Sequence, residues 1–250
     1  MAKDFNSQKV VERYDDHIRR LIPGYELMHQ QVDALLQSVL SSDAQILIVG
    51  CGTGYELEYL LNRHPTWTFK AVDPSLGMLQ KAQALIQQLG QSERVQFIHG
   101  ETAALPTQPK FDAALSILVA HFVPHELKSD FFAEISKRLR AKGLLITYDL
   151  MAVENPQQFK ALPLLCQSNG LSVEQSQAMM ERLGQDFFTL SFDDYQQLLQ
   201  RTGFEQVHCF SQVLTYQGLI AQKKQDEVLS LPDFDNAVLT QQGIQQKIPI

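Results

Sequence analysis

Residues 46–54 join two features that few folds accommodate together, an apolar run and three closely spaced glycines. They read Ile-Leu-Ile-Val-Gly-Cys-Gly-Thr-Gly. A short apolar run of this kind is typical of a strand that is buried on both faces of a parallel sheet. The glycines let the backbone turn sharply and approach a ligand closely, and the N-terminus of a following helix favours polar or anionic groups. The segment therefore predicts a strand, a ligand-binding turn and a helix in succession.

The same succession recurs along the chain. Apolar runs predict further strands at 67–72, 95–98, 111–119 and 144–148. Amphipathic stretches predict helices between them, and Gly90 and Gly143 are expected to end two of these helices. Two more β-rich runs, 207–210 and 213–221, can pair as an antiparallel hairpin. We therefore predict an α/β fold: a Rossmann-like seven-stranded sheet with the last strand antiparallel and a helical lid.

The pattern divides the chain into three parts. Residues 1–43 predict two N-terminal helices, broken at Pro23-Gly24, that contribute to the lid. Residues 44–222 form the predicted main domain, in which the alternation stops at 151–190; a structureless loop of that length is uncommon, so we expect a helical insertion. Residues 223–250 are weakly patterned and are predicted to be a C-terminal tail.

Composition and charge argue against a membrane-spanning protein, a secreted protein and a non-specific nucleic-acid-binding protein. Of 250 residues, 44% are hydrophobic and 20% are charged, which is typical of a folded, water-soluble protein. The net charge of −7 disfavours non-specific binding to nucleic acid or anionic lipid. The longest nearly apolar run, 111–123, falls short of the roughly 20 residues of a membrane-spanning helix. The N-terminal residues lack the apolar region of a signal peptide, so we expect a cytoplasmic protein with no membrane contact.

An acidic residue stands where a nucleoside would be recognised. Asp73 ends the second predicted strand, where a carboxylate can accept hydrogen bonds from both hydroxyls of a ribose. The dinucleotide-binding pattern Gly-x-Gly-x-x-Gly would need a glycine at position 55, which is Tyr55. The turn and Asp73 together predict a ligand that contains adenosine and argue against a nicotinamide cofactor.

With these motifs, the chain resembles the class I S-adenosylmethionine-dependent methyltransferases over residues 44–222. GCGTG and VDPSLGMLQKA resemble the first two motifs of that family, Gly100-Glu101-Thr102 the third, and residues 115–121 the fourth. The resemblance implies S-adenosylmethionine as the cofactor, bound by Gly50, Cys51, Gly52, Gly54, Asp73, Pro74, Met78, Glu101, Thr102 and Ser116. Ile48 departs from the family, because many members carry an acid there that helps to hold the amino group of the cofactor.

Shorter segments resemble the subgroup that contains carboxy-S-adenosylmethionine synthase, a tRNA-modification enzyme. They are Phe5 with Val10-Val11, Ile22-Pro23-Gly24-Tyr25 and Thr202-Gly203-Phe204-Glu205. In that enzyme an arginine of the inserted helices holds the added carboxylate of the cofactor, and the resemblance implies prephenate as the carboxyl donor. The matching place here falls near Met180, which is apolar, with Arg182 close enough to substitute.

The acceptor side offers fewer signals. His121 lies at the strand end nearest the expected acceptor and could act as a general base. Tyr14, Tyr25, Phe122 and Met180 are candidates to line a substrate pocket, although such side chains are more often ordinary packing. His121 and His125 lack an evident third ligand, and the three cysteines are too widely spaced for zinc, so no metal is expected.

These observations predict methyl transfer to an unidentified acceptor. A sulfonium methyl group is already activated, so the protein mainly has to align the acceptor nucleophile with it. The net charge favours a small molecule over tRNA as the acceptor. Synthesis of carboxy-S-adenosylmethionine, a non-catalytic S-adenosylmethionine-binding protein and, last, a nicotinamide-linked oxidoreductase remain as alternatives. The sequence leaves the oligomeric state open, a dimer included.

Overall fold

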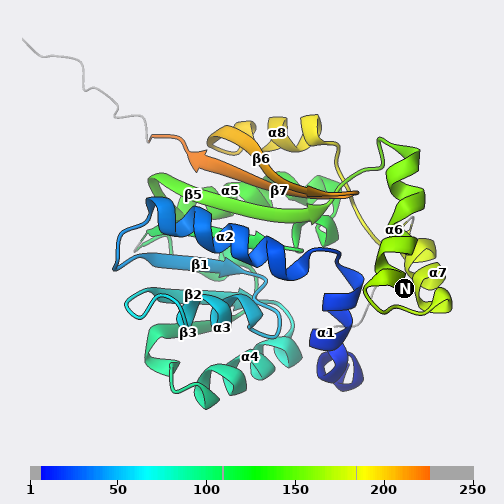
Figure 1. The fold of residues 1–250 in the computed structure, drawn as a ribbon. Coiled ribbons are helices and arrows are strands. Elements are labelled where there is room, and N and C mark those ends of the chain that lie inside the picture. Colours follow the sequence, from blue (N-terminus) through cyan, green and yellow to red (C-terminus); the bar gives the residue numbers. More distant parts are fainter. Residues whose placement is uncertain (1–6, 109, 184, 226–250) are drawn as a thin grey trace, which may run out of the picture.

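A seven-stranded sheet forms the centre of the computed structural model, which describes residues 7–108, 110–183 and 185–225 (Figure 1). The strands are β1 (Gln45–Val49), β2 (Thr68–Asp73), β3 (Val95–His99), β4 (Phe111–Ile117), β5 (Leu139–Leu150), β6 (Phe204–Val213) and β7 (Tyr216–Lys223). Their order across the sheet is β3-β2-β1-β4-β5-β7-β6. The first five strands pair in parallel, whereas β7 pairs antiparallel with both β5 and β6. The predicted fold class, including the terminal hairpin, is confirmed.

Helices cover both faces of the sheet because successive residues of a buried strand point in opposite directions. Ile46 and Ile48 of β1 share one core with α2 (Tyr25–Val39), α3 (Tyr55–Leu61) and α4 (Leu76–Gln88). Leu47 and Val49 share the opposite core with α5 (Lys128–Arg138) and α8 (Phe192–Arg201). The continuous apolar run is therefore explained by a strand with two buried faces.

Three helices lie together at one end of the sheet, beyond the end of β5 (Figure 1). They are α1 (Gln8–Leu21) and the two helices of the predicted insertion, α6 (Pro156–Ser168) and α7 (Val173–Leu183). The thiol of Cys166 donates to the backbone oxygen of Leu21 at 3.3 Å, which ties the insertion to α1. The buried side chains of α2, Met28 and Leu36 among them, share a core with Ile46 and Ile48 of β1, and the assignment of the N-terminal helices to a lid stays a prediction.

Short 3₁₀ turns connect several of these elements, and two elements end elsewhere than predicted. The 3₁₀ turns are η1 (Ser92–Arg94), η2 (Thr102–Ala104), η3 (Ala120–Phe122) and η4 (His125–Leu127). The fourth strand ends before the predicted residue 119, because Leu118 takes a left-handed conformation with φ 60°. Gly143 does not end a helix: α5 ends at Arg138, and Gly143 lies inside β5, where a Cβ atom would approach the oxygen of Arg140 at 3.0 Å.

The strand order fixes where a ligand can bind. The chain runs outward from β1 to β2 and β3 and then crosses to β4 on the other side of β1. A crevice forms at the carboxyl ends of the strands where the order reverses in this way. No helix within the described ranges is long and apolar enough to cross a membrane. Phe5 and most of the predicted tail, residues 226–250, lie outside these ranges.

Candidate functional site

The glycine turn after β1 uses its glycines for different reasons. Gly50, Gly52 and Gly54 all have positive φ, at 69°, 52° and 92°. A Cβ atom on Gly50 would lie 2.5 Å from Cγ2 of Val119, so this glycine permits close contact with the segment after β4. A Cβ atom on Gly52 would have no neighbour within 4 Å among the described residues, so the turn is open to a ligand there.

Asp73 holds this turn at the end of β2. One carboxylate oxygen accepts the amide of Gly52 and the other the amide of Ser75, both at 2.8 Å. Burial raises the pKa of the Asp73 carboxyl, and the two amide hydrogen bonds oppose that shift. Because each carboxylate oxygen has about two acceptor positions, Asp73 can still accept hydrogen bonds from a ligand.

A cavity of about 440 Å³ adjoins the turn and is named here the cofactor cleft. Of the predicted cofactor-binding residues, it is lined by Gly50, Pro74, Glu101 and Thr102. The hydroxyl of Thr102 is buried and has no hydrogen-bond partner among the described residues. The cleft is also lined by residues that the sequence did not assign to a ligand, Phe131 and Glu134 among them.

The other predicted cofactor residues, Asp73 among them, lie outside the lining of this cleft. Cys51, Gly52 and Gly54 belong to the turn itself, and Cys51 is buried. Met78 is buried on α4, where its amide is capped by the hydroxyl of Ser75 at 3.3 Å. Ser116 is fully buried within β4, and its hydroxyl has no partner in the part of the chain described. Direct contacts of Met78 and Ser116 with a ligand therefore remain predictions.

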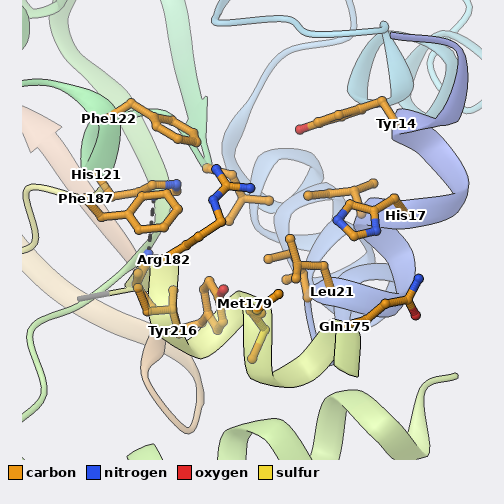
Figure 2. A pocket seen from close by; sticks show the side chains of 16 residues that line it. Tyr14, His17, Leu21, His121, Phe122, Gln175, Met179, Arg182, Phe187 and Tyr216 are labelled. Atoms are coloured by element: carbon orange, nitrogen blue, oxygen red, sulfur yellow. Dashed lines mark hydrogen bonds between the residues drawn. The ribbon is translucent and has the colours of Figure 1, made fainter. Parts of the chain in front are cut away.

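A second cavity, of about 220 Å³, lies between α1, α7 and the ends of β4 and β5, and is named here the acceptor cavity (Figure 2). Tyr14 lines it from α1 and His121 and Phe122 line it from η3. Phe122 also lines the cofactor cleft, so the two cavities share this ring as a wall. Three of the residues predicted to face an acceptor are therefore found together.

Two predicted substrate residues point elsewhere. Tyr25 is buried on α2 and packs against His29 and Tyr55, with ring centroids 4.5 and 5.3 Å away. Met180 does not line the acceptor cavity, whereas Gln175, Met179 and Arg182 of the same helix do. These three residues share one face of α7, because positions separated by three, four and seven residues lie on the same side of a helix. Tyr25 and Met180 are therefore absent from the lining of this cavity, and their contact with a substrate stays a prediction.

His121 faces the acceptor cavity with a buried carboxylate behind it. Its Nδ1 atom lies 2.9 Å from Oδ1 of Asp149, and both side chains are nearly inaccessible to solvent, at 6% and 1% exposure. The amide of Leu150 approaches the same nitrogen at 3.4 Å, which is the longer contact. A proton on Nδ1 that is donated to Asp149 leaves Nε2 as the acceptor on the other edge of the ring.

Two further hydrogen bonds fix the carboxylate of Asp149 on the side away from His121. Its second oxygen, Oδ2, accepts the hydroxyls of Thr147 at 2.6 Å and Tyr195 at 2.8 Å. Burial and the nearby Asp149 charge raise the pKa of Tyr195 far above its usual value, so this tyrosine stays a donor. Sequence reasoning missed Asp149, although an acid at the end of the strand beside the predicted base was a usable signal. It could not find Tyr195, which comes from α8.

Lys128 supports the turn that carries His121. Its ammonium group donates to the backbone oxygen of Ala120, the first residue of η3. Burial lowers the pKa of Lys128 to about 8, and the charge of Asp149 opposes this shift. The lysine therefore fixes the backbone beside His121 and does not reach the acceptor cavity, whose lining excludes it.

Helix α1 is fastened to the glycine turn by hydrogen bonds. Asp15 accepts the hydroxyl of Thr53 and the ammonium group of Lys81, both at 2.5 Å. Lys81 also donates to the backbone oxygen of Val11 at 3.0 Å. Tyr14 and His17, on the same helix as Asp15, both line the acceptor cavity. No group of three or more metal-ligating side chains occurs within residues 7–108, 110–183 and 185–225.

Comparison with known proteins agrees with this architecture. A family model described as a methyltransferase domain matches residues 46–143. Carboxy-S-adenosyl-L-methionine synthase of Photorhabdus laumondii is 23% identical over 229 residues, which cover 88% of this chain and 89% of that protein. The biotin biosynthesis bifunctional protein BioHC of Teredinibacter turnerae is 31% identical over 153 residues, 57% of this chain but a quarter of that protein.

A solved structure supports the fold. A putative O-methyltransferase from Nostoc punctiforme superimposes with a TM-score of 0.59 at 17% identity, covering 78% of this chain and 57% of that one. The seven-stranded order, the glycine turn with Asp73 and the matched domain point to the same conclusion. Residues 46–143 therefore match a methyltransferase domain, and the comparisons together support a class I S-adenosylmethionine-dependent methyltransferase.

Proposed function

We propose that this protein transfers the methyl group of S-adenosylmethionine to a small acceptor whose proton is taken by His121. The observation that carries the proposal is the buried His121–Asp149 pair, which faces a cavity adjacent to the cofactor cleft. Few other side chains around this cavity can accept a proton at neutral pH, because most of its lining is apolar.

The glycine turn and the adjoining cofactor cleft fit the proposed cofactor in three respects. The turn follows the carboxyl end of β1, and Gly52 leaves room for a ligand beside the cleft. Asp73 has acceptor positions left for ribose hydroxyls, and the buried hydroxyl of Thr102 lacks a partner among the described residues. Ile48 is buried in the core, so contacts to the amino group must come from other atoms. When bound, S-adenosylmethionine supplies an activated methyl group.

The role of the chain is to position the acceptor and to accept its proton. Nε2 of His121 would take the proton that an acceptor hydroxyl or amine gives up when it is methylated. The hydrogen bond from Nδ1 to Asp149 fixes the tautomer and stabilises the positive ring that results. Thr147 and Tyr195 hold the carboxylate in place, so the pair is preorganised.

The size of the acceptor cavity favours a small molecule. Its volume of about 220 Å³ lies below the range of roughly 300–1,000 Å³ that is usual for drug-sized ligands. α1 and α7 close it from two sides. A nucleotide presented by a folded tRNA would have to displace these helices, which supports the preference for a small acceptor over tRNA.

A second candidate function is the synthesis of carboxy-S-adenosylmethionine. Arg182 lines the acceptor cavity and offers a cation where Met180 does not. The similarity to the Photorhabdus enzyme also extends over 88% of the chain. Incubation with S-adenosylmethionine and prephenate, followed by mass spectrometry, tests this candidate. A carboxylated product, or carboxylated cofactor in freshly purified protein, would replace the methyl-transfer proposal.

The test of methyl transfer first measures cofactor binding and then measures methyl transfer to candidate acceptors. Calorimetry with S-adenosylhomocysteine measures cofactor binding, and a panel of small hydroxyl and amine compounds is then assayed with methyl-labelled S-adenosylmethionine. We expect His121→Gln to reduce the transfer rate by roughly 10²- to 10⁴-fold, the usual contribution of a general base, with unchanged cofactor affinity.

His125→Gln is the matched control, because His125 lies in the neighbouring turn η4 outside the acceptor cavity. It should retain full activity. If His121→Gln transfers methyl groups as fast as the wild type, His121 is not the base. If the cofactor binds but no compound of a broad panel is methylated, the non-catalytic alternative gains over the proposal.

A further inference from the structure

Among the described residues, the lining of the acceptor cavity carries a positive charge and no negative one. None of its lining residues, all within the described part of the chain, is an aspartate or a glutamate. Arg182 is the lining residue with a permanent positive charge. The walls around it are mostly apolar, with Leu21, Met179, Phe187 and Tyr216 among them. A cation in an apolar cavity without an acidic wall attracts an anion more strongly than it would in water.

Only one of the three guanidinium nitrogens of Arg182 is bonded to a carboxylate of the protein within the described residues. Its Nε atom donates to Oδ2 of Asp186 at 3.0 Å. Its two terminal nitrogens, Nη1 and Nη2, have no hydrogen-bond partner among the described residues. Figure 2 shows the guanidinium group extending from α7 into the middle of the cavity, between Tyr14 on one side and His121 with Phe122 on the other. The bond to Asp186 thus orients the side chain and leaves its outer edge for a ligand.

We propose that the acceptor is a small carboxylic acid, whose carboxylate pairs with Nη1 and Nη2 of Arg182 while its nucleophile lies against Nε2 of His121. This inference rests on the proposed methyl transfer and names its substrate class. A planar guanidinium group matches the two oxygens of a carboxylate and a single negative charge. A phosphate ester would carry up to about two negative charges, and a single arginine would leave one of them without a partner. The apolar walls then surround the body of the acid.

The pairing is tested by binding, which needs no knowledge of the true acceptor. Protein saturated with S-adenosylhomocysteine is titrated calorimetrically with 3-phenylpropionate and with its neutral analogue 3-phenylpropionamide. We expect the acid to bind at least tenfold more tightly than the amide, and we expect Arg182→Met to abolish this difference without weakening the amide. Methionine keeps an unbranched stem of similar shape and removes the charge.

Two further variants separate charge from folding. Asp186→Asn removes the competing carboxylate and leaves the arginine, so the acid should bind as tightly as in the wild type or more tightly. Arg201→Met removes an arginine near the C-terminal end of α8, outside the acceptor cavity, and should leave the preference intact. Together these variants keep the test valid if Arg182→Met alone lowers the stability of the fold.

The outcomes are distinct. Equal binding of acid and amide, or a preference that survives Arg182→Met, would overturn the inference. Carboxylated cofactor that co-purifies with the wild type and is lost from Arg182→Met would also overturn it, because the carboxylate would then belong to the cofactor. Binding of S-adenosylhomocysteine is measured first: its failure would refute the proposed function itself, whereas its success without an acid preference would refute the acid pairing alone.

Discussion

Replacing Asp73 with alanine tests the cofactor site most directly. The Asp73 carboxylate accepts hydrogen bonds from the backbone amides of Gly52 and Ser75, both at 2.8 Å. It has acceptor positions left for the ribose. Hydrogen bonds to a charged group contribute about 1.5–3 kcal/mol, so losing the ribose contact should weaken the binding of S-adenosylhomocysteine by roughly ten- to a hundredfold. The two orphaned amides should in addition lower the free energy of unfolding by about 2–4 kcal/mol.

The assay must separate affinity from stability. Calorimetric titration gives the dissociation constant, and urea unfolding of the same preparation gives the free energy of unfolding. Asp112→Ala is the matched control: Asp112 accepts the amide of Gln45 at 2.8 Å and pairs with Arg140, but it lies at the opposite, amino end of β4. It should lose stability and keep its affinity. Unchanged affinity in Asp73→Ala, or an equal loss in Asp112→Ala, would refute the assignment of Asp73.

Three further predictions concern the turn, the buried lysine and helix α1. Gly50→Ala should lower the free energy of unfolding by about 2–4 kcal/mol through left-handed strain and the clash with Val119, and urea unfolding should show partial recovery in the double variant with Val119→Ala. The pKa of Lys128 falls from 10.5 to about 8, so the unfolded state binds more protons between these values. Stability should therefore rise with pH across this window, by about 2 kcal/mol relative to Lys128→Met between pH 7.5 and 10; a constant difference between the two proteins would contradict the shift. Asp15→Ala removes the bonds to Thr53 and Lys81, and limited trypsin digestion with mass spectrometry should show several-fold faster cleavage within α1.

The sequence predicted the parts of the site that depend on local pattern. The apolar run of β1, the glycines after it and Asp73 are close in sequence or follow the strand–helix alternation, so their arrangement could be deduced without coordinates. His121 was placed correctly at the end of a parallel strand. Its partner Asp149 lies 28 residues away in sequence, and Tyr195 comes 46 residues after that, which local periodicity does not connect.

The differences between the predictions and the structure have equally physical causes. Met180 and Met179 differ by one position, about 100° around a helix, and the sequence alone does not fix the rotation of α7 against α1. Gly143 looked like a helix stop, but its surroundings are set by a register shift that pairs Phe111 with Leu139 and Ala113 with Leu144. Such a bulge depends on the neighbouring strand, and it lets β5 begin at Leu139 instead of Leu144.

Phe122 lines both the cofactor cleft and the acceptor cavity, so a ligand that moves its ring on one side would couple the two binding sites. A ligand that fixes the ring from one side changes the space on the other. Binding linkage is reciprocal, so the factor by which an occupied cleft alters affinity for an acceptor equals the factor by which the acceptor alters affinity for the cleft's ligand. Compounds screened against the protein alone would consequently be ranked by the wrong affinity, and the product complex is the form in which to search for the acceptor.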